Sequence, residues 1–182
     1  MGLQEAWRRE FRIRLETPRL ALRPLVAEDV EWLTRLYCDP EVNRFLWAEA
    51  AGSPERMRRE AEAVVELDGM MCRFGHWAIE DRATGVVCGW TELGKLRLWS
   101  GPSDEIGLSY VVAPEFWGRG IATEAAGRLL RHALEVLGLE CVMAVIMVGN
   151  KASRRVLKKL GMRPVGRRAV SGKRLEFFRI EK

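Results

Sequence analysis

The sequence predicts a mixed α+β fold of about six to seven strands flanked by about four helices. Two observations carry this prediction. Hydrophobic residues make up 48% and charged residues 30% of the 182 residues, which is typical of a globular chain that can bury a complete core. Short apolar runs typical of strands are interleaved with longer runs of helical spacing. We expect one domain over residues 1–182, with residues 1–15 as a polar leader.

The first elements are a strand and two helices. Residues 19–25 alternate apolar and polar side chains, which predicts a half-buried strand. Residues 26–38 place apolar side chains at helical spacing, with acidic residues in the first turns, where the helix dipole favours them. A second helix is expected after Ser53 and Pro54, because serine caps helices and proline suits their first turn, and it extends to about residues 68–69.

Strands dominate the middle of the chain. Residues 75–81 and 86–93 are separated by a four-residue link, 82–85, which predicts an antiparallel hairpin. Residues 94–103 contain turn-forming glycine and proline and are expected to form a loop, and residues 104–112 are a further strand.

The last part of the chain alternates helices and strands. These are a helix over 120–137, a strand over 141–148 that is apolar enough to be buried on both faces, a helix opened by Asn150 and closed before Gly161, and two strands over 163–169 and 174–180. The sequence shows no internal repeat, low-complexity tract or linker.

Several classes of protein are excluded by composition. No apolar run reaches the roughly 18–20 residues that a membrane span needs, and the first residues are too charged for a signal peptide, so we expect a cytoplasmic protein without membrane contact. With two histidines and no C-x-x-C spacing, the sequence predicts no metal site and no disulfide, and we expect each thiol to be buried. The cysteines are Cys38, Cys72, Cys88 and Cys141.

Charge is divided unevenly along the chain. Residues 1–112 carry 15 Lys and Arg against 19 Asp and Glu, whereas residues 113–182 carry 15 against 6. A basic half of this kind indicates a polyanionic partner, which can be nucleic acid, a membrane surface or a phosphorylated cofactor. Charge alone does not choose among the three.

A glycine-rich turn follows the strand at 104–112. Residues 117–122 (WGRGIA) lead directly into a predicted helix, whose first amides have no partner inside the helix. Glycine lets a ligand approach the backbone closely, so the turn is suited to a phosphate, which Arg119 can also contact. It matches neither the P-loop nor the dinucleotide fingerprint. The segment alone is explained equally well by a tight turn that needs glycine.

A second strand-to-helix junction, at Asn150, stands beside the first. Its helix is crowded with basic residues: Lys151, Arg154, Arg155, Lys158 and Lys159. Two such junctions side by side make a cleft for an extended anionic ligand.

Together, APEFWGRGIATEAA, the following buried strand and GNKASRRVLKKLGM resemble the acetyl-CoA-binding core of the GNAT acetyltransferases. The opening ETPRLALRPL is similar to the first strand of the RimJ/RimL-type subgroup, which acetylates ribosomal proteins at their N-termini. The resemblance covers about residues 16–180. It implies a GNAT-like, mostly antiparallel sheet with a splayed cofactor cleft between the fourth and fifth strands, acetyl-CoA as cofactor and CoA as product.

The resemblance also assigns binding residues. In the loop, phosphate would be held by backbone amides, although Trp117 stands where the family has glutamine or arginine. Asn150 would contact the cofactor arm, and Ser153 would lie near the thiol. Both are also explained as ordinary cap and first-turn residues. The full predicted binding set is Val111, Val112, Gly118, Arg119, Gly120, Ile121, Ala122, Thr123, Asn150 and Ser153, with the two valines pairing with the pantetheine arm.

Two departures from the family pattern concern catalysis. The tyrosine that acts as general acid in many relatives is Leu157 here, so Ser153 or water would take its place. Relative to Pro114, Gly107 falls where the subgroup has glutamate, and Glu105 lies two residues earlier, roughly 6.5–7 Å along the strand unless a bulge intervenes.

The family chemistry is direct attack of a neutral amine on the acetyl thioester, without a covalent enzyme intermediate. We expect Glu105 to be the general base, with Glu92 as the second candidate, and a strand amide near Val112 to stabilise the carbonyl oxygen. Phe45 and Trp47 are expected in the acceptor wall.

The acceptor we expect is a protein N-terminal α-amine. The alternatives are a small-molecule acceptor such as an aminoglycoside or polyamine, a non-catalytic acyl-CoA-binding protein, or a nucleic-acid-binding module. The absence of a nucleic-acid signature argues against the last of these. The sequence leaves open whether the protein forms a homodimer.

Overall fold

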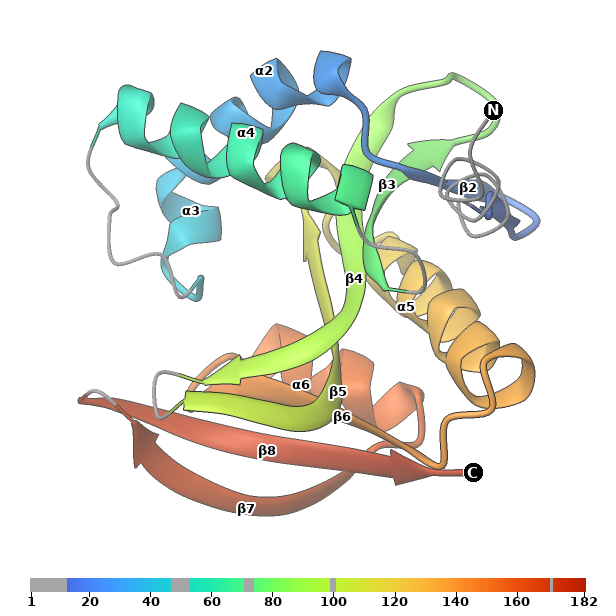
Figure 1. The fold of residues 1–182 in the computed structure, drawn as a ribbon, viewed down its shortest axis with the longest axis vertical. Helices are drawn as coiled ribbons and strands as arrows, with labels where there is room; N and C mark the ends of the chain where they lie inside the picture. The colour runs from blue at the N-terminus through green and yellow to red at the C-terminus, as the bar shows by residue number, and fades with distance from the viewer. Residues whose placement is uncertain (1–12, 47–52, 71–73, 99–100, 171) are drawn as a thin grey trace.

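A computed structural model describes residues 13–46, 53–70, 74–98, 101–170 and 172–182. Its strands form one sheet in the order β1-β2-β3-β4-β5-β6-β8-β7 (Figure 1). The strands are β1 (Leu15–Glu16), β2 (Leu20–Pro24), β3 (Gly75–Asp81), β4 (Val87–Leu98), β5 (Gly101–Val112), β6 (Cys141–Met147), β7 (Arg163–Val170) and β8 (Lys173–Glu181). Neighbouring strands are antiparallel except β5 and β6, which are parallel. The predicted mixed, mostly antiparallel α+β fold is confirmed.

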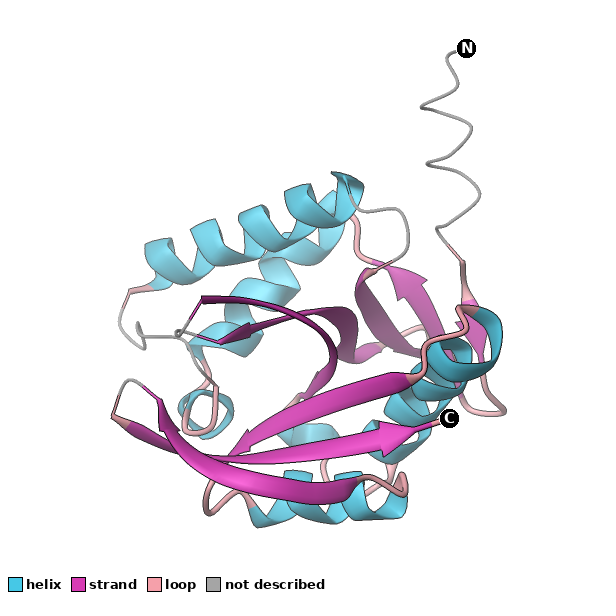
Figure 2. Cartoon of the chain, turned by 60° about the horizontal axis from the view of Figure 1, so that its bottom comes forward, coloured by secondary structure: helices cyan, strands magenta, loops and turns pink. Residues whose placement is uncertain are grey.

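Helices lie on both faces of the sheet (Figures 1 and 2). On one face, Leu33 and Ala61 share a buried cluster with Trp90 of β4. On the other face, Leu129 and Leu157 belong to a larger cluster. The helices are α2 (Val30–Cys38), α3 (Pro40–Asn43), α4 (Pro54–Met70), α5 (Ile121–Arg131) and α6 (Lys151–Lys159), with short 3-10 turns at Ala27–Asp29 and Pro114–Phe116. We call the side with α2 and α4 the α2/α4 face.

Polar caps fix where three of these helices begin. The side chains of Ser53 and Asn150 accept hydrogen bonds from amides of the first turns of α4 and α6, as their residue types predict. Asp39 does the same for α3, which was not predicted. The signal was present, because aspartate followed by proline is a common helix start.

The predicted loop over residues 94–103 is wrong. β4 continues to Leu98 and β5 already begins at Gly101, so the two strands form a long hairpin. Within it Leu96 packs against a third cluster, which contains Met143, Leu175 and Phe177. The glycines in this stretch indicate a turn locally, but cross-strand pairing and burial of Leu96 outweigh that preference.

The predicted leader and thiols also need correction. Leu15, the last residue of the leader, is buried in β1, which adds one strand to those predicted. Cys88 is buried, but Cys141 is only partly buried and Cys38 is exposed; Cys72 lies outside the described residues. Within the described part of the chain, no helix is long and apolar enough to cross a membrane.

A buried histidine makes stability depend on pH. α5 passes into a π-helical turn, His132–Val136, where His132 is 4% exposed. Burial lowers the pKa of His132 below its ordinary value, and the nearby Arg128 cation lowers that pKa further. The unfolded chain therefore takes up this proton at a higher pH than the folded protein, so the contribution to stability is present above about pH 6.5 and is lost as the pH falls below it.

We expect the free energy of unfolding, measured in urea, to fall between about pH 7 and pH 5.5 in the native protein. His132→Gln, which cannot take up a proton, should flatten that dependence. An equal decline in both proteins would show that His132 does not cause it.

Candidate active site

The site begins where β5 and β6 separate. These two parallel strands pair at a single position, where Gly107 of β5 stands opposite Met143 of β6. Beyond Gly107, β5 stays paired with β4 as far as Val112, while its other edge leaves β6. We call this opening the splay and the Gly107–Met143 pair its vertex. It lies between the fourth and fifth predicted strands, where the cofactor cleft was expected.

The register decides which backbone groups of β5 face the splay. Because the Ala113 amide donates to the Cys88 carbonyl, Gly89 and Val112 form a non-hydrogen-bonded pair, and the backbone groups of Val112 point away from β4. Those of Val111 point toward β4. The Trp117 indole donates to the Val112 carbonyl over 2.6 Å, which ties the glycine loop to this edge. Of the two predicted valines, Val112 is therefore the one whose amide faces the splay.

The glycine loop has the backbone that its sequence predicts. Gly118 and Gly120 have φ of 76° and 78°, in the left-handed region, where a side chain would be strained. A Cβ at Gly118 would meet nothing within 4 Å, so the space above the loop is open. Gly120 is the N-cap of α5, whose first amides lack partners inside the helix. The loop thus offers an open cradle of N–H donors to an anion.

Side chains from the start of the sheet hold this loop in place. Glu124, in the first turn of α5, accepts from the Thr17 hydroxyl over 2.6 Å and forms an ion pair with Arg19 at 2.6 Å. Arg19 also donates to the Arg119 carbonyl. Burial raises the pKa of Glu124, but the hydrogen bonds from Thr17 and Arg19 outweigh it and hold that pKa below its ordinary value. Glu124 is therefore a charged anchor near neutral pH.

Across the splay, a tyrosine meets the start of α6. The Tyr110 hydroxyl lies 2.7 Å from the Ser153 Oγ and donates to the Ser153 carbonyl over 3.1 Å. Ser153 is itself held by Asn150, whose side chain accepts from its amide. Burial raises the pKa of Tyr110, and the Ser153 hydrogen bond offsets only part of that rise, so the phenol stays protonated. Leu157, at the family's tyrosine position, is fully buried in the core.

Sequence reasoning missed Tyr110, because its contact with Ser153 joins residues 43 positions apart. The signal was the tyrosine itself, in the strand next to the expected cleft.

On the α2/α4 face, polar side chains form a row across three strands. His76 of β3 stands opposite Glu92 of β4, and Glu92 stands opposite Ser109 of β5. His76 Nε2 lies 3.7 Å from Glu92 Oε2, and their side chains are 17% and 29% exposed. A Cβ on Gly94 would meet Glu92 Oε1 at 2.9 Å, so the carboxylate leans over Gly94, the cross-strand partner of Gly107 at the vertex.

Trp90 adds an unsatisfied donor to this row. Its indole packs edge-on against the His76 ring, with centroids 5.2 Å apart. The indole N–H is buried and has no hydrogen-bond partner within the described part of the chain. An unpaired buried donor costs about 1–3 kcal/mol, so it marks a place where a ligand acceptor would be stabilising.

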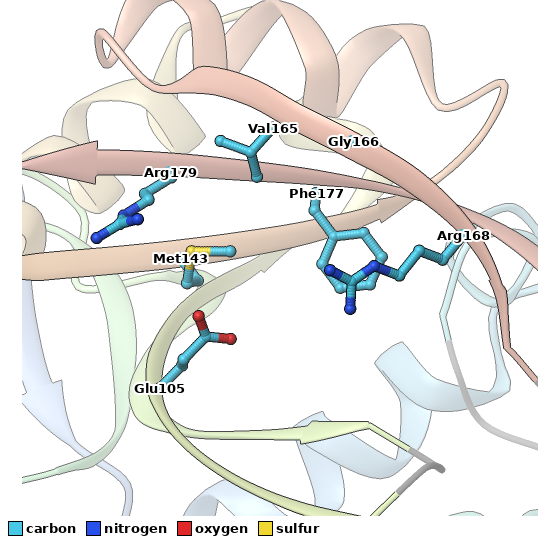
Figure 3. Close-up of a pocket in the computed structure, with 7 residues that line it drawn as sticks. All are labelled: Glu105, Met143, Val165, Gly166, Arg168, Phe177 and Arg179. Atoms are coloured by element: carbon cyan, nitrogen blue, oxygen red, sulfur yellow. The ribbon is translucent and has the colours of Figure 1, made fainter.

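Glu105 lies on the other side of the vertex from the splay. The pairing of β5 with β4 is regular from Ile106 to Val112, and its irregularity falls between the pairs Lys95–Ile106 and Arg97–Pro102, so no bulge moves Glu105 into the Gly107 position. Glu105 is exposed and lines a cavity with Met143 and side chains of β7 and β8 (Figure 3). Its assignment as general base stays a prediction.

The predicted acceptor-wall residues and the basic residues of α6 have different surroundings in the structure. Phe45 is partly buried beside Arg44, and Trp47 lies outside the described residues. Arg154 forms an ion pair at 2.9 Å with the buried Glu176, which also pairs with Arg167. Part of the basic surplus therefore holds α6 against β7 and β8. The exposed cations of α6 are Lys151, Arg155, Lys158 and Lys159.

Comparison with known proteins finds relatives along most of the chain. The family described as an acetyltransferase (GNAT) domain matches residues 19–163. The FsC-acetyl coenzyme A-N(2)-transacetylase of Aspergillus fumigatus is 35% identical over 158 residues, which cover 81% of this chain and 64% of that protein, a little under two thirds of its length. An uncharacterized N-acetyltransferase of Bacillus subtilis is 31% identical over 152 residues, covering 84% of each.

Solved structures share the fold. The ribosomal-protein alpha-N-acetyltransferase RimL, solved in complex with coenzyme A, superimposes with a TM-score of 0.75 over 93% of this chain and 98% of its own. Its sequence is 16% identical to this chain, so the likeness concerns the arrangement of helices and strands.

Proposed function

The chain belongs to the GNAT family of acetyltransferases, and on that premise we propose that it transfers an acetyl group from acetyl-CoA to the α-amine of a protein N-terminus. Members of this family are acyltransferases that use acetyl-CoA. The finer part of the proposal is the acceptor. It is supported by the groups gathered on the α2/α4 face beside the vertex of the splay.

The residues of the splay fit acetyl-CoA. The open glycine loop with the first amides of α5 would hold the pyrophosphate, and the Val112 amide and Asn150 would line the path of the pantetheine arm. The bound cofactor supplies an acetyl thioester that is activated toward attack by an amine. The protein must then orient the amine and remove its proton.

Glu92 is better placed than Glu105 to take that proton. It leans over Gly94 beside the vertex, and His76 orients it from the far side. The two glycines at the vertex, Gly94 and Gly107, have no side chains, and this lets the Glu92 carboxylate lie directly over Gly94. We assign Glu92 as general base, directly or through water, and His76 as the residue that positions it.

The unpaired Trp90 indole supports a peptide acceptor. In a protein N-terminus the first carbonyl group lies two bonds from the amine, so a peptide that presents its amine to Glu92 also brings a hydrogen-bond acceptor toward that N–H, which is buried in the free protein. A polyamine has no carbonyl group to offer. The α-amine also has an ordinary pKa of about 7.7–8, so much of it is already neutral near pH 7 to 8 and needs only a weak base.

The experiment is a thiol-release assay offering N-terminal peptides, spermidine and an aminoglycoside in parallel. We expect peptides to give the highest kcat/KM. A preference for either small amine would reject the N-terminal acceptor. Failure of both acetyl-CoA and CoA to raise the melting temperature would reject the donor, because a ligand that binds only the native state must stabilise it.

Tyr110→Phe tests the contact across the splay. The change removes the hydroxyl beside Ser153 and keeps the ring, so we expect kcat to fall about tenfold to hundredfold, toward the lower end of what a proton donor contributes. The KM for acetyl-CoA should change less than twofold. A kcat equal to that of the native protein would show that turnover depends neither on this hydroxyl nor on its hydrogen bond with Ser153.

A further inference from the structure

A cavity with two arginines lies beside the vertex, on the side away from the splay. It has a volume of about 220 Å³. We call it the arginine pocket, and it is lined by Glu105, Met143, Val165, Gly166, Arg168, Phe177 and Arg179. Met143 is also the β6 partner at the vertex, so the pocket adjoins the point where β5 and β6 separate.

Apolar side chains lie in the middle of the pocket, and its two arginines stand at opposite ends of it (Figure 3). Met143 and Phe177 form the floor, and each is 5% exposed. The Arg168 guanidinium stacks over the Phe177 ring, 5.3 Å from its centroid, which holds the cation in place and leaves its edge available. Among the described residues, no carboxylate forms an ion pair with Arg168.

Arg179 keeps donors available despite its partners. Its Nε donates to the Cys141 sulfur, and its Nη2 lies 2.9 Å from Glu181. A guanidinium has five N–H donors, so more than half remain for a ligand. Because Glu181 pairs with Arg179, Arg168 is the lining cation that no carboxylate of the described residues pairs with.

We propose that the arginine pocket binds a carboxylate of the acceptor, so that preferred acceptors carry a carboxylate about two residues from the reactive amine. A guanidinium recognises a carboxylate by charge-assisted, bidentate hydrogen bonds, which a neutral group of the same shape does not replace. The proposal rests on the proposed function, because it names the class of acceptor that the same site selects.

The spacing follows from the position of the pocket. The amine reacts at the vertex, and Glu105, on the wall of the pocket, lies two residues along β5 from Gly107. An extended peptide advances about 3.3–3.6 Å per residue, so a carboxylate on the second residue reaches the pocket. That carboxylate can belong to an acidic side chain or to the C-terminus of a dipeptide.

Matched acceptor pairs separate these two sources. Alanyl-aspartate amide is compared with alanyl-asparagine amide, and free alanyl-glycine with alanyl-glycine amide, in the thiol-release assay. We expect the native protein to prefer the carboxylate member of at least one pair by tenfold or more in kcat/KM. A difference under twofold in both pairs would overturn the proposal.

Variants tie the preference to the pocket. Arg168→Gln and Arg179→Gln should each reduce the preference to threefold or less, while acetyl-CoA affinity stays unchanged. Arg168→Lys, which keeps the charge but loses the planar fork, should give an intermediate value. Arg131→Gln is the matched control, since it removes an exposed arginine from the far end of α5. An equal loss of preference in that control would overturn the proposal.

A binding measurement keeps the proposal testable without turnover. Calorimetry of the CoA-saturated protein should show the N-acetylated aspartate peptide, or N-acetylated alanyl-glycine, binding at least tenfold more tightly than its amide counterpart, and Arg168→Gln should abolish that difference. Equal binding within both pairs overturns the carboxylate proposal and leaves the acetyltransferase proposal standing. Absence of both acetyl-CoA binding and thiol release would reject the acetyltransferase proposal, and with it the carboxylate proposal that rests on it.

Discussion

Glu92→Gln is expected to lower kcat by about 10²- to 10⁴-fold, the range that a positioned general base contributes. The substitution keeps the shape of the side chain and its place over Gly94 but removes the group that accepts the proton. Because Glu92 lies on the α2/α4 face and not in the glycine loop, acetyl-CoA affinity should change less than twofold. Steady-state kinetics with a peptide acceptor, together with calorimetry of acetyl-CoA binding, measure both effects.

Glu105→Gln is the decisive comparison, because the two carboxylates are rival candidates for the base. If Glu92 is the base, Glu105→Gln should alter acceptor preference and leave kcat within about fivefold. Glu62→Gln, on the exposed side of α4, controls for the loss of one negative charge. A native-like kcat in Glu92→Gln combined with a hundredfold loss in Glu105→Gln would return the role to Glu105.

His76 should behave as a positioning residue. His76→Gln removes the group beside Glu92 and leaves the carboxylate in place, so we expect a smaller loss of kcat, about tenfold, than in Glu92→Gln. The loss should fall on kcat and leave the KM for acetyl-CoA within about twofold, because His76 lies beside Glu92 and not in the glycine loop. A kcat equal to that of the native protein would show that His76 does not orient the base.

The parts of the site that follow from local sequence were predictable. The glycine loop needs left-handed backbone at Gly118 and Gly120, and only glycine adopts it without strain. Asn150 caps α6 because of its own residue type. The strand over 141–148 is apolar on both faces because it lies inside the sheet. In each case the residues that specify the structure are neighbours in the chain.

The row of His76 and Glu92 depends on a one-residue irregularity that the sequence does not reveal. Glu80 pairs with Val87, whereas Ile79 pairs with Gly89, so the register of the hairpin shifts between them. Without that bulge His76 would stand opposite Thr91. Because successive residues of a strand point to opposite faces, a single skipped position decides whether the histidine and the carboxylate meet.

The long β4–β5 hairpin shows the same limit. Gly94 and Gly107 resemble turn residues in the sequence, yet they stand opposite each other at the vertex, inside paired strands. Glycine is needed at Gly107 because a Cβ there would lie 2.8 Å from the Leu96 side chain. Pairing between distant segments overrides local preference, and the two glycines leave space that the Leu96 side chain and the Glu92 carboxylate occupy.

The division of charge is explained only in part by the cofactor. Arg154 and Arg167 share an ion pair with the single carboxylate of Glu176, so they serve the packing of α6 on the sheet. Arg168 and Arg179 line the arginine pocket, on the acceptor side of the vertex. The exposed cations of α6 and Arg119 remain for phosphates. The basic residues of the second half therefore do not form one anion-binding site. They divide among the packing of α6, the arginine pocket and the exposed surface near the glycine loop and α6.

Gly120→Val is expected to weaken acetyl-CoA binding at least a hundredfold, about 2.8 kcal/mol. Gly120 has φ of 78° at the N-cap of α5, a conformation that a β-branched residue adopts only with strain, and a side chain there would stand among the amides that face the phosphates. In the native protein, acetyl-CoA at 100 times its Kd should add about 2.7 kcal/mol of stability, which differential scanning fluorimetry detects as a rise in Tm. In Gly120→Val the same concentration should add about 0.4 kcal/mol or less, so that most of the rise in Tm is lost.

Gly138→Val separates backbone strain from loss of the site. Gly138 also has a left-handed φ, 67°, and open space around its Cβ position, but it follows the π-helical turn at the far end of α5. Both variants should lose stability without ligand, because each forces a branched side chain into the same backbone region. Only Gly120→Val should lose the response to acetyl-CoA. A native-like response in Gly120→Val would mean that the glycine loop is a structural turn and that the phosphates bind elsewhere.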